Sequence, residues 1–277
     1  METASLPSLE DLEIDLLLEG ISRQYGSDFR GYARGALKHR LLGTLAAESL
    51  PSISALQERI LRDLPTMSRL HAALTTNVSG MFRDPIFYLT LRRRIIPLLR
   101  TYPFVRIWVA GCSTGEEVYS TAIVLAEENL TTRVRLYATD MSEGVLARAK
   151  AGVYPVGHLQ SYEMRYLAAG GRRSLTDYLD VGRDDMTLAP ALRDNVVFGQ
   201  HDLAIDRSFN EFNVILCRNV MIHFGVALRR HVHALLHESL CRLGILGIGA
   251  RESLRGSGQE DRYDVLDAES RLFRRLG

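Results

Sequence analysis

Two acidic side chains directly follow a glycine-flanked loop in the run VRIWVAGCSTGEEVYSTA, residues 105–122. Glu116 and Glu117 stand where many α/β folds bind a phosphate, at the start of a helix that follows a strand. Two carboxylates at this place would repel a phosphate and attract a cation. The loop also lacks the third glycine of the dinucleotide fingerprint and the GK[ST] ending of a P-loop. The pattern therefore favours a ligand that carries positive charge.

A third carboxylate, Asp140, ends the run YATD, 25 residues after Gly115. In nucleotide-binding sheets, an acid about 20 residues further on reaches the ribose hydroxyls. The alternative is that Asp140 caps a helix that begins at Met141 or Ser142. Taken together, the three carboxylates favour S-adenosylmethionine, which combines a ribose with an ammonium group and a sulfonium.

The elements that must position these side chains alternate between helix and strand from about residue 86. Helices are expected over 86–100, 116–128, 142–151 and 225–242, and strands over 104–109, 134–139, 195–199, 212–217 and 244–249. This alternation predicts an α/β fold with a doubly wound sheet and helices on both faces. Ligands of such sheets bind at the carboxyl ends of the strands, where the loop 110–115 would lie. Residues 155–194 interrupt the rhythm and predict a helix followed by a small antiparallel insert.

The chain up to about residue 75 is helical in pattern, which predicts a small all-α domain. Within it, Arg30, Arg34 and Lys38 are four residues apart, a spacing that stacks them on one side of a helix. Two interpretations stay open. The cations form a solvated helix face, or they form a docking surface for an acidic partner.

Composition narrows the class of protein. The 277 residues are 46% hydrophobic and carry a formal net charge of +1, so no global field favours nucleic acid or an anionic membrane as partner. Three widely spaced cysteines, Cys112, Cys217 and Cys241, indicate a reducing compartment and no metal site. The N-terminus lacks the pattern of a signal peptide, and no apolar run approaches the roughly 20 residues of a membrane helix. We expect a cytoplasmic protein without membrane insertion.

Six runs carry a family resemblance: ALTTNVSGMFRDP, AGCSTGEEVYS, ATDMSEGVLARAKAGVYP, VVFGQHDL, FNVILCRNVMIHF and GARESL. In order and spacing they resemble the CheR-type chemotaxis receptor methyltransferases, from about residue 30 to the end. The resemblance implies an all-α domain over 1–75 and a class I (Rossmann-like) methyltransferase domain over 76–277, with a β-subdomain insert at about 160–195. It also implies methyl transfer from S-adenosyl-L-methionine to glutamate side chains of chemoreceptor cytoplasmic helices in sensory adaptation. The products would be glutamyl methyl esters and S-adenosyl-L-homocysteine.

The resemblance also implies site residues. Its cofactor contacts fall on Asn77, Ser79, Arg83, Glu117, Asp140, Asp202, Leu203, Cys217, Arg218 and Asn219. Glu117 would hold the methionine amino group and Asp140 the adenosine end, while Glu116 complements the helix dipole. Arg83 is the candidate for steadying the incoming carboxylate, with an ion pair to Asp84 as the alternative.

Four departures from the family pattern bear on these expectations. Ser79 replaces a usual Thr, Asp202 a usual Asn, and Gly249-Ala250-Arg251-Glu252 a usual GHSE. His223, a further catalytic candidate, replaces a Tyr. Its imidazole either fills the same niche as a neutral ring, or titrates near pH 6.5 and changes activity. Four aromatic residues are expected in the core rather than at the cofactor: Phe82, Phe87, Trp108 and Tyr119.

Partners and alternatives follow from the same resemblance. Arg30, Arg34 and Lys38 would steer the receptor helix, and the insert would bind a receptor-tail peptide as an added strand. A second function stays open because of His223 and the altered GARES run: a non-catalytic module that binds S-adenosylmethionine or S-adenosylhomocysteine and controls a partner. A methyltransferase acting on a small molecule or RNA is a third, disfavoured by the neutral net charge and the NVSGMFR run.

Overall fold

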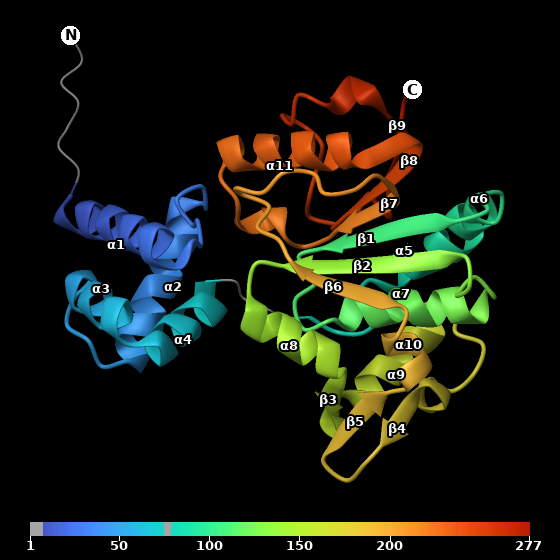
Figure 1. Ribbon diagram of the computed structural model, residues 1–277, viewed down its shortest axis with the longest axis horizontal. Coiled ribbons are helices and arrows are strands. Elements are labelled where there is room, and N and C mark those ends of the chain that lie inside the picture. The colour runs from blue at the N-terminus through green and yellow to red at the C-terminus, as the bar shows by residue number, and fades with distance from the viewer. Residues whose placement is uncertain (1–7, 75–78) are drawn as a thin grey trace. The chain divides into compact units, whose positions relative to one another are not determined.

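The computed structural model describes residues 8–74 and 79–277. The chain forms two compact units, one of Met1–Asn77 with His223–Arg229 and the other of Val78–Ile222 with Arg230–Gly277. Figure 1 colours them by residue number. The expected domain boundary between residues 75 and 76 lies outside the described residues.

The first unit is helical, as expected. Its helices are α1 (Leu9–Tyr25), α2 (Arg34–Ala47), α3 (Ile53–Arg62) and α4 (Leu64–Leu74). The Ser8 hydroxyl caps α1 by accepting a hydrogen bond from the Asp11 amide, and Gly26 ends the helix with a φ of 71°. Buried side chains recur at helical spacing on α1, as at Ile14, Leu17 and Ile21. These apolar faces pack together as the core of the unit.

The second unit is built on a seven-stranded sheet with the order β6-β2-β1-β7-β8-β10-β9. The strands are β1 (Val105–Ala110), β2 (Val134–Asp140), β6 (Val196–Gln200), β7 (Phe212–Cys217), β8 (Leu240–Ile248), β9 (Tyr263–Asp267) and β10 (Leu272–Arg275). The strands β6, β2, β1, β7 and β8 run parallel to one another, and β10 is antiparallel to both β8 and β9. Strand order reverses between β1 and β7, which makes their carboxyl ends the topological switch point.

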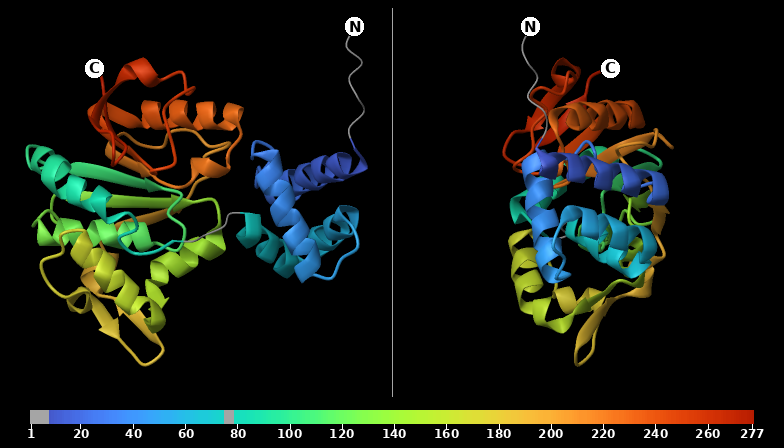
Figure 2. Two further views of the ribbon diagram at one scale, coloured as in Figure 1. Left: turned by 180° about the vertical axis from the view of Figure 1, so that it is seen from behind. Right: turned by 90° about the vertical axis from the view of Figure 1, so that its left-hand side faces the viewer.

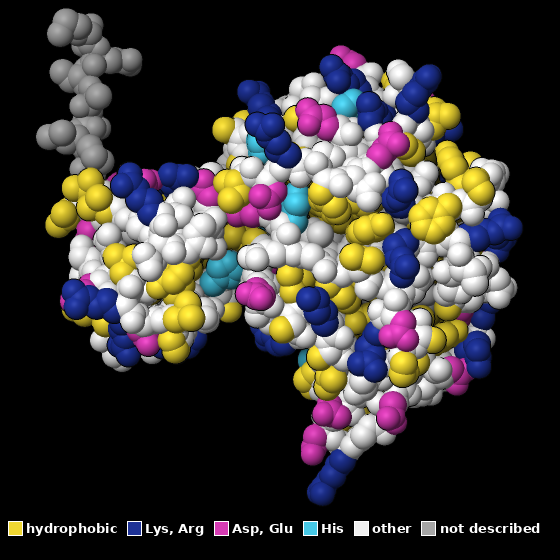
Figure 3. All heavy atoms as spheres, viewed as in Figure 1, with side chains coloured by type: hydrophobic (Ala, Val, Ile, Leu, Met, Phe, Trp, Pro, Cys, Tyr) yellow, Lys and Arg dark blue, Asp and Glu magenta, His cyan; other side chains and the backbone are white. Residues whose placement is uncertain are grey.

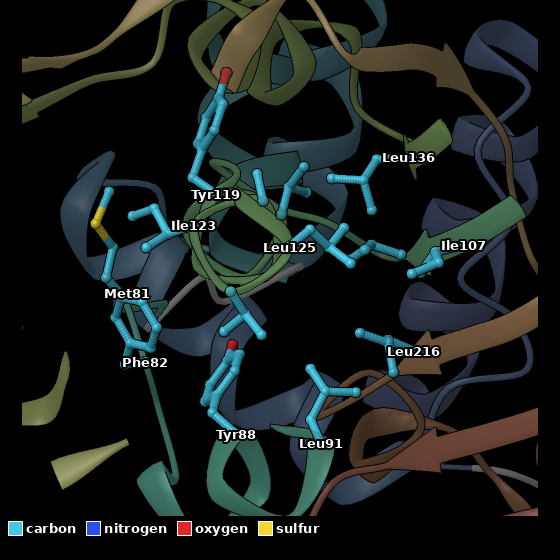
Figure 4. Packing of buried hydrophobic residues seen from close by; sticks show 14 of the residues in the cluster. Met81, Phe82, Tyr88, Leu91, Ile107, Tyr119, Ile123, Leu125, Leu136 and Leu216 are labelled. Atoms are coloured by element: carbon cyan, nitrogen blue, oxygen red, sulfur yellow. The ribbon is translucent and has the colours of Figure 1, made fainter. Parts of the chain in front are cut away.

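Helices cover both sides of this sheet, which confirms the α/β prediction. They are α5 (Pro85–Thr90), a π-helix (Leu91–Ile95), α6 (Ile96–Leu99), α7 (Glu116–Glu127), α8 (Glu143–Ala151), α10 (Pro190–Arg193) and α11 (Val226–Ser239). The strands lie between α7 and α11 in Figure 1 and in the left-hand view of Figure 2. Figure 4 shows Ile107, Leu136 and Leu216 pointing from the strands toward α7. All four aromatic residues expected in the core, Phe82, Phe87, Trp108 and Tyr119, are at most 2% exposed.

The insert between β2 and β6 contains a small antiparallel sheet with the order β3-β5-β4, as predicted, but its first strand precedes the helix that was expected to come before the sheet. It comprises β3 (Val153–Pro155), a 3-10 turn (Val156–His158), α9 (Leu159–Ala168), a second turn (Leu175–Tyr178), β4 (Leu179–Val181) and β5 (Asp185–Leu188). The buried guanidinium of Arg92, in the π-helix, donates to the Ala169 carbonyl at 3.1 Å and pairs with Glu127 of α7. This contact anchors the insert to the sheet domain.

The structure differs from the predicted elements near the C-terminus. The helix expected to reach residue 242 ends at Ser239, because β8 begins at Leu240 opposite Phe212. The C-terminal strands β9 and β10 were not predicted from the sequence.

Among residues 8–74 and 79–277, no helix is long and apolar enough to cross a membrane. Acidic and basic side chains are interspersed over the visible face in Figure 3, in keeping with the net charge.

Candidate active site

The loop between β1 and α7 has a backbone that needs glycine at both ends. Gly111 has a φ of 69°, and a Cβ there would lie 2.6 Å from Val220 Cγ2. Gly115 has a φ of 94°, and a Cβ there would lie 3.1 Å from Ala149 Cβ. Ser113, between them, also adopts a positive φ, of 51°. The G-x-x-x-G spacing thus lets the loop turn tightly at the switch point.

Asp140 ends β2 and connects two loops at this edge of the sheet. Its Oδ2 atom accepts a hydrogen bond from the Ser113 amide at 3.0 Å, and its Oδ1 atom accepts one from the Ser142 amide at 3.1 Å. Burial raises the pKa of this carboxyl above its ordinary value, although the backbone amides of Ser142 and Ser113 act in the opposite direction. The N-cap of α8 is Ser142, whose hydroxyl accepts from the Val145 amide. The capping role considered for Asp140 therefore belongs to Ser142.

The two glutamates at the start of α7 have different surroundings. Glu116 is buried, and its Oε2 atom accepts a hydrogen bond from the Thr114 hydroxyl at 2.7 Å. The half-buried Glu117 pairs with Arg218, Oε1 to Nη1, at 3.0 Å. Glu117 is therefore the member of the pair that faces the end of β7.

Arg218 follows β7 and is the most enclosed cation of this site, with a side chain 2% exposed. Its Nη2 atom lies 2.8 Å from Asp84 Oδ2, and its guanidinium carbon is 4.0 Å from the centre of the Phe87 ring. Burial lowers its pKa, but the negative charges of Glu117 and Asp84 outweigh burial and leave the pKa above its ordinary value. Two carboxylates thus hold a permanently charged guanidinium at the switch point.

The segment that carries Ser79 and Arg83 has an unusual backbone conformation and is hydrogen-bonded to α7. Phe82 and Asp84 have φ angles of 53° and 59°. The Phe82 amide donates to Ser120 Oγ on α7 at 2.8 Å. Asp84 pairs with Arg218. The partner of Asp84 that was considered from the sequence is Arg83. Asn77, expected to contact the cofactor, lies outside the described residues.

Asp202 and Leu203 follow β6, on the other side of Asp140. The His201 amide donates to the Asp140 carbonyl at 3.1 Å, which places this turn beside the end of β2. The Asp202 Oδ1 atom accepts a hydrogen bond from the Ala204 amide at 2.8 Å. Leu203 is buried. Asp202 Oδ1 thus acts as an acceptor, a role that the side-chain oxygen of the usual Asn can also fill.

Glu252 is a functional candidate that sequence reasoning missed. It is 5% exposed, and its carboxylate accepts hydrogen bonds from the amides of Asn219, Met221 and Gly249 at 3.0, 2.8 and 2.5 Å. Burial raises its pKa, while those amides lower it. Ala250 and Arg251, where the run departs from GHSE, are both exposed. Gly249 and Glu252, which match the first and last residues of the usual GHSE run, were the sequence signal that could have identified this candidate.

His223 belongs to the first unit, so its role beside Arg83 stays a prediction. Arg40 Nη2 lies 2.9 Å from His223 Nδ1. Burial, followed by the charge of Arg40, lowers the pKa of His223 to about 4. This pKa argues against the titration near pH 6.5 that was considered from the sequence, and the ring is neutral at physiological pH.

The basic stripe of the first unit is neutralised by acids of α1. Arg30 pairs with Glu19, Arg34 with Asp15, and Lys38 with Glu10, at 2.7, 2.7 and 2.8 Å. Arg34 and Lys38 lie on α2, but Arg30 lies in the turn before it, because the Tyr32 amide closes that turn on the Phe29 carbonyl. The prediction of one continuous helix through Arg30 was wrong. The docking role of the stripe stays a prediction.

Two buried polar atoms at the switch point have no hydrogen-bond partner within the described part of the chain. They are Ser113 Oγ, in the β1–α7 loop, and Arg218 Nε. Arg218 is one of the residues predicted to bind the cofactor, whereas Ser113 was not predicted; the two residues contact the carboxylates of Glu117 and Asp140, respectively. Carboxylates for hydroxyl and ammonium donors, together with unsatisfied polar atoms, suit S-adenosylmethionine.

A family model described as CheR methyltransferase, SAM binding domain, matches residues 77–272. This chain belongs to the CheR methyltransferase family. As a CheR methyltransferase it uses S-adenosylmethionine, and its sheet is the Rossmann-like sheet of class I methyltransferases. The match covers every described residue that was predicted above to contact the cofactor.

Relatives of this CheR methyltransferase extend over nearly all of the chain. A Pseudomonas putida protein named Cher3 is 44% identical over 96% of this chain and 97% of its own length. A chemotaxis protein methyltransferase of Listeria innocua is 30% identical over 89% of this chain and 92% of its own. Among solved structures, a SAM-dependent methyltransferase from Geobacter sulfurreducens in complex with S-adenosyl-L-homocysteine covers 65% of this chain and 54% of its own, with a TM-score of 0.35 and 18% identity.

Proposed function

We propose that this CheR methyltransferase methylates glutamate side chains on the cytoplasmic helices of chemoreceptors, giving glutamyl methyl esters in sensory adaptation. The observation that carries the proposal is the paired Arg218 at the switch point, held by Glu117 and Asp84, together with Asp140, which holds the β1–α7 loop through the Ser113 amide. The names of relatives, such as the chemotaxis protein methyltransferase of Listeria innocua, supply the pathway.

The proposed reaction needs little acid–base chemistry. The bound cofactor supplies a methyl group on a sulfonium sulfur, which a carboxylate oxygen takes as the sulfur–carbon bond breaks and its electron pair stays on sulfur. A glutamate carboxylate is already ionised at neutral pH, with a reference pKa of about 4.3, so no general base is required. The protein contributes proximity and orientation.

The described residues suggest a division of labour. Asp140 would accept hydrogen bonds from ribose hydroxyls, and Glu117 would accept one from the methionine ammonium group. The charge of Arg218 is already balanced by two carboxylates, which makes it a poor partner for a third. The family resemblance, which implies this role for Arg83, supports assigning the steadying of the substrate carboxylate to Arg83.

Substrate docking is proposed for two regions. In the N-terminal domain, residues 1–75, Arg30, Arg34 and Lys38 would exchange their α1 partners for acids of the receptor helix, and such exposed pairs exchange at little cost. In the insert, at about 160–195, β4 is an edge strand that pairs with β5, and Val181 on it is 40% exposed. A receptor-tail peptide would add there as a further strand.

The test is to incubate the protein with radiolabelled S-adenosylmethionine and receptor-rich membranes. Base-labile label on the receptor band is expected. Arg83→Ala should abolish transfer while the affinity for S-adenosylhomocysteine falls only modestly. The matched control is Arg133→Ala, an exposed arginine at the opposite edge of the sheet, which should behave as the unmodified protein.

The alternative function is a non-catalytic module that binds the cofactor and controls a partner. It was motivated by His223 and by the altered GARES run. The exposure of Ala250 and Arg251 weakens the second motive, since neither side chain contributes to the buried contacts of Glu252. Tight binding of S-adenosylhomocysteine without any transfer to receptors would favour this alternative.

A further inference from the structure

The carboxylate of Glu252 connects the ends of two neighbouring strands. It lies in the segment after β8, and it accepts backbone hydrogen bonds from Asn219 and Met221 in the segment after β7. The same carboxylate accepts a hydrogen bond from the Gly249 amide, which fixes the side chain to its own segment. The backbone that follows Arg218 is therefore held by a single buried side chain.

Two further features show that the local backbone is shaped around this contact. Asn219 has a φ of 62°, a left-handed conformation that asparagine adopts more readily than most residues. A Cβ at position 249 would lie 2.8 Å from three atoms: the Asn219 amide nitrogen, Asn219 Nδ2 and Glu252 Oε2. Glycine is therefore required at 249 to let the carboxylate reach the amides. An ionised carboxylate offers acceptors alone, whereas a carboxamide in its place would turn a donor toward an N–H group.

We propose that Glu252 is a positioning residue for cofactor binding. It holds Asn219 and Met221 so that Arg218 reaches Glu117 and Asn219 faces the cofactor. The inference rests on the proposed cofactor roles of Arg218 and Asn219. Glu252 acts through these residues, so its loss should change the affinity for the cofactor and leave the affinity for the receptor unchanged.

The experiment compares two glutamine variants of the full chain. Glu252→Gln should raise the Kd for S-adenosylhomocysteine and the KM for S-adenosylmethionine by about tenfold or more, because buried amides lose their acceptor. The KM for the receptor should not change. The matched control is Glu260→Gln, since Glu260 also accepts a hydrogen bond from a backbone amide, that of Gly256, but is exposed and eight residues away. That control should keep both constants.

A second variant tests the same contact without removing the charge. Gly249→Ala places a methyl group between Asn219 and the carboxylate, so it should raise the same two constants as Glu252→Gln. A folded Glu252→Gln protein whose S-adenosylhomocysteine Kd stays within twofold of the Glu260→Gln control would overturn the proposal. So would unfolding of both the 252 and the 249 variants at the assay temperature, since Glu252 would then serve the fold alone. An unmodified chain that binds S-adenosylhomocysteine but transfers no methyl group to receptors would instead refute the proposed function and leave the comparison of Kd values intact.

Discussion

Glu117 and Arg218 are 101 residues apart in the chain and form an ion pair of 3.0 Å at the point where strand order reverses. The pair joins the start of α7 to the end of β7, the two segments that flank the switch point. Asp84 completes it from a third segment, so Arg218 is balanced by one half-buried and one exposed carboxylate. Glu117 and Asp84 can be substituted one at a time. Comparing the two variants distinguishes the binding of the ligand by Glu117 from the support that both carboxylates give to Arg218.

Glu117→Gln should weaken S-adenosylhomocysteine binding by about tenfold or more, because a charge-assisted hydrogen bond to the ammonium group is lost. Asp84→Asn removes the other partner of Arg218 but not the proposed ammonium ligand, so its effect should be clearly smaller. Isothermal titration calorimetry of both variants measures the difference. Equal losses of affinity would indicate that Glu117 acts only by holding Arg218.

Asp140 should make cofactor binding depend on pH. Its pKa is raised by burial, and the ionised form accepts the ribose hydrogen bonds, so affinity should fall as pH falls through this raised pKa. In the absence of ligand the sign is reversed. The folded state holds this proton more tightly than the unfolded chain, so the contribution of Asp140 to stability decreases as pH rises through the folded pKa.

Titrations of S-adenosylhomocysteine between pH 5 and 8 test this prediction. Asp140→Asn should bind weakly and lose the part of the pH dependence that belongs to this carboxyl. A variant that kept the profile of the unmodified protein would assign the dependence to another group.

His223 should not act as a pH switch. With a pKa of about 4, the ring is neutral from pH 5.5 to 8, so methyl transfer should show no limb near pH 6.5 that depends on it. The lowered pKa also means that the unfolded chain binds the proton more tightly. The stability of the protein should therefore fall as pH falls from about 6.5 toward 4, and His223→Phe should remove that part of the loss. Rate profiles and thermal unfolding of the two proteins check both expectations, and a limb near pH 6.5 that disappears in the variant would refute the first.

Gly111→Ala should destabilise the protein by about 1–3 kcal/mol, because alanine is strained at a φ of 69° and its Cβ would meet Val220. Gly144→Ala is the matched control. That glycine lies in α8, and no atom outside its own helix turn lies within 4 Å of the place that the added methyl group would take, so the change should be neutral or stabilising by about 0.5–1 kcal/mol. Chemical denaturation of both variants gives the two free energies. A Gly111→Ala protein as stable as the control would show that the loop relaxes without cost.

Local pattern was sufficient to predict the elements that carry the site. The largely apolar runs FVRIWV and VRLYAT predicted β1 and β2 within one residue at either end, because buried central strands consist of near-continuous apolar runs. The helix start at Glu116 followed from its glycine and acids. The family motifs then named residues that converge on the switch point, among them Glu117, Asp140 and Arg218.

The contacts that join distant segments could not be predicted in the same way. Nothing near Arg218 in the sequence indicates that its partners are Glu117 and Asp84, because the pairing depends on strand order. Glu252 belongs to the GARE run, which departs from the family's usual GHSE. Only the hydrogen bonds of Glu252 show that the two unchanged residues, Gly249 and Glu252, make the buried contact. Arg30 has helical spacing, yet a turn closed on Phe29 removes it from α2.

The helical unit takes residues from two distant parts of the chain. Phe224 packs edge to face on Tyr32, with ring centres 5.1 Å apart, and Leu228 fills the space beside Gly31. A gene truncated after codon 77 would therefore encode a fragment without part of its own core, and the remainder would keep apolar side chains that had lost their partners. The helical unit and the sheet domain therefore cannot be separated by a single cut in the chain.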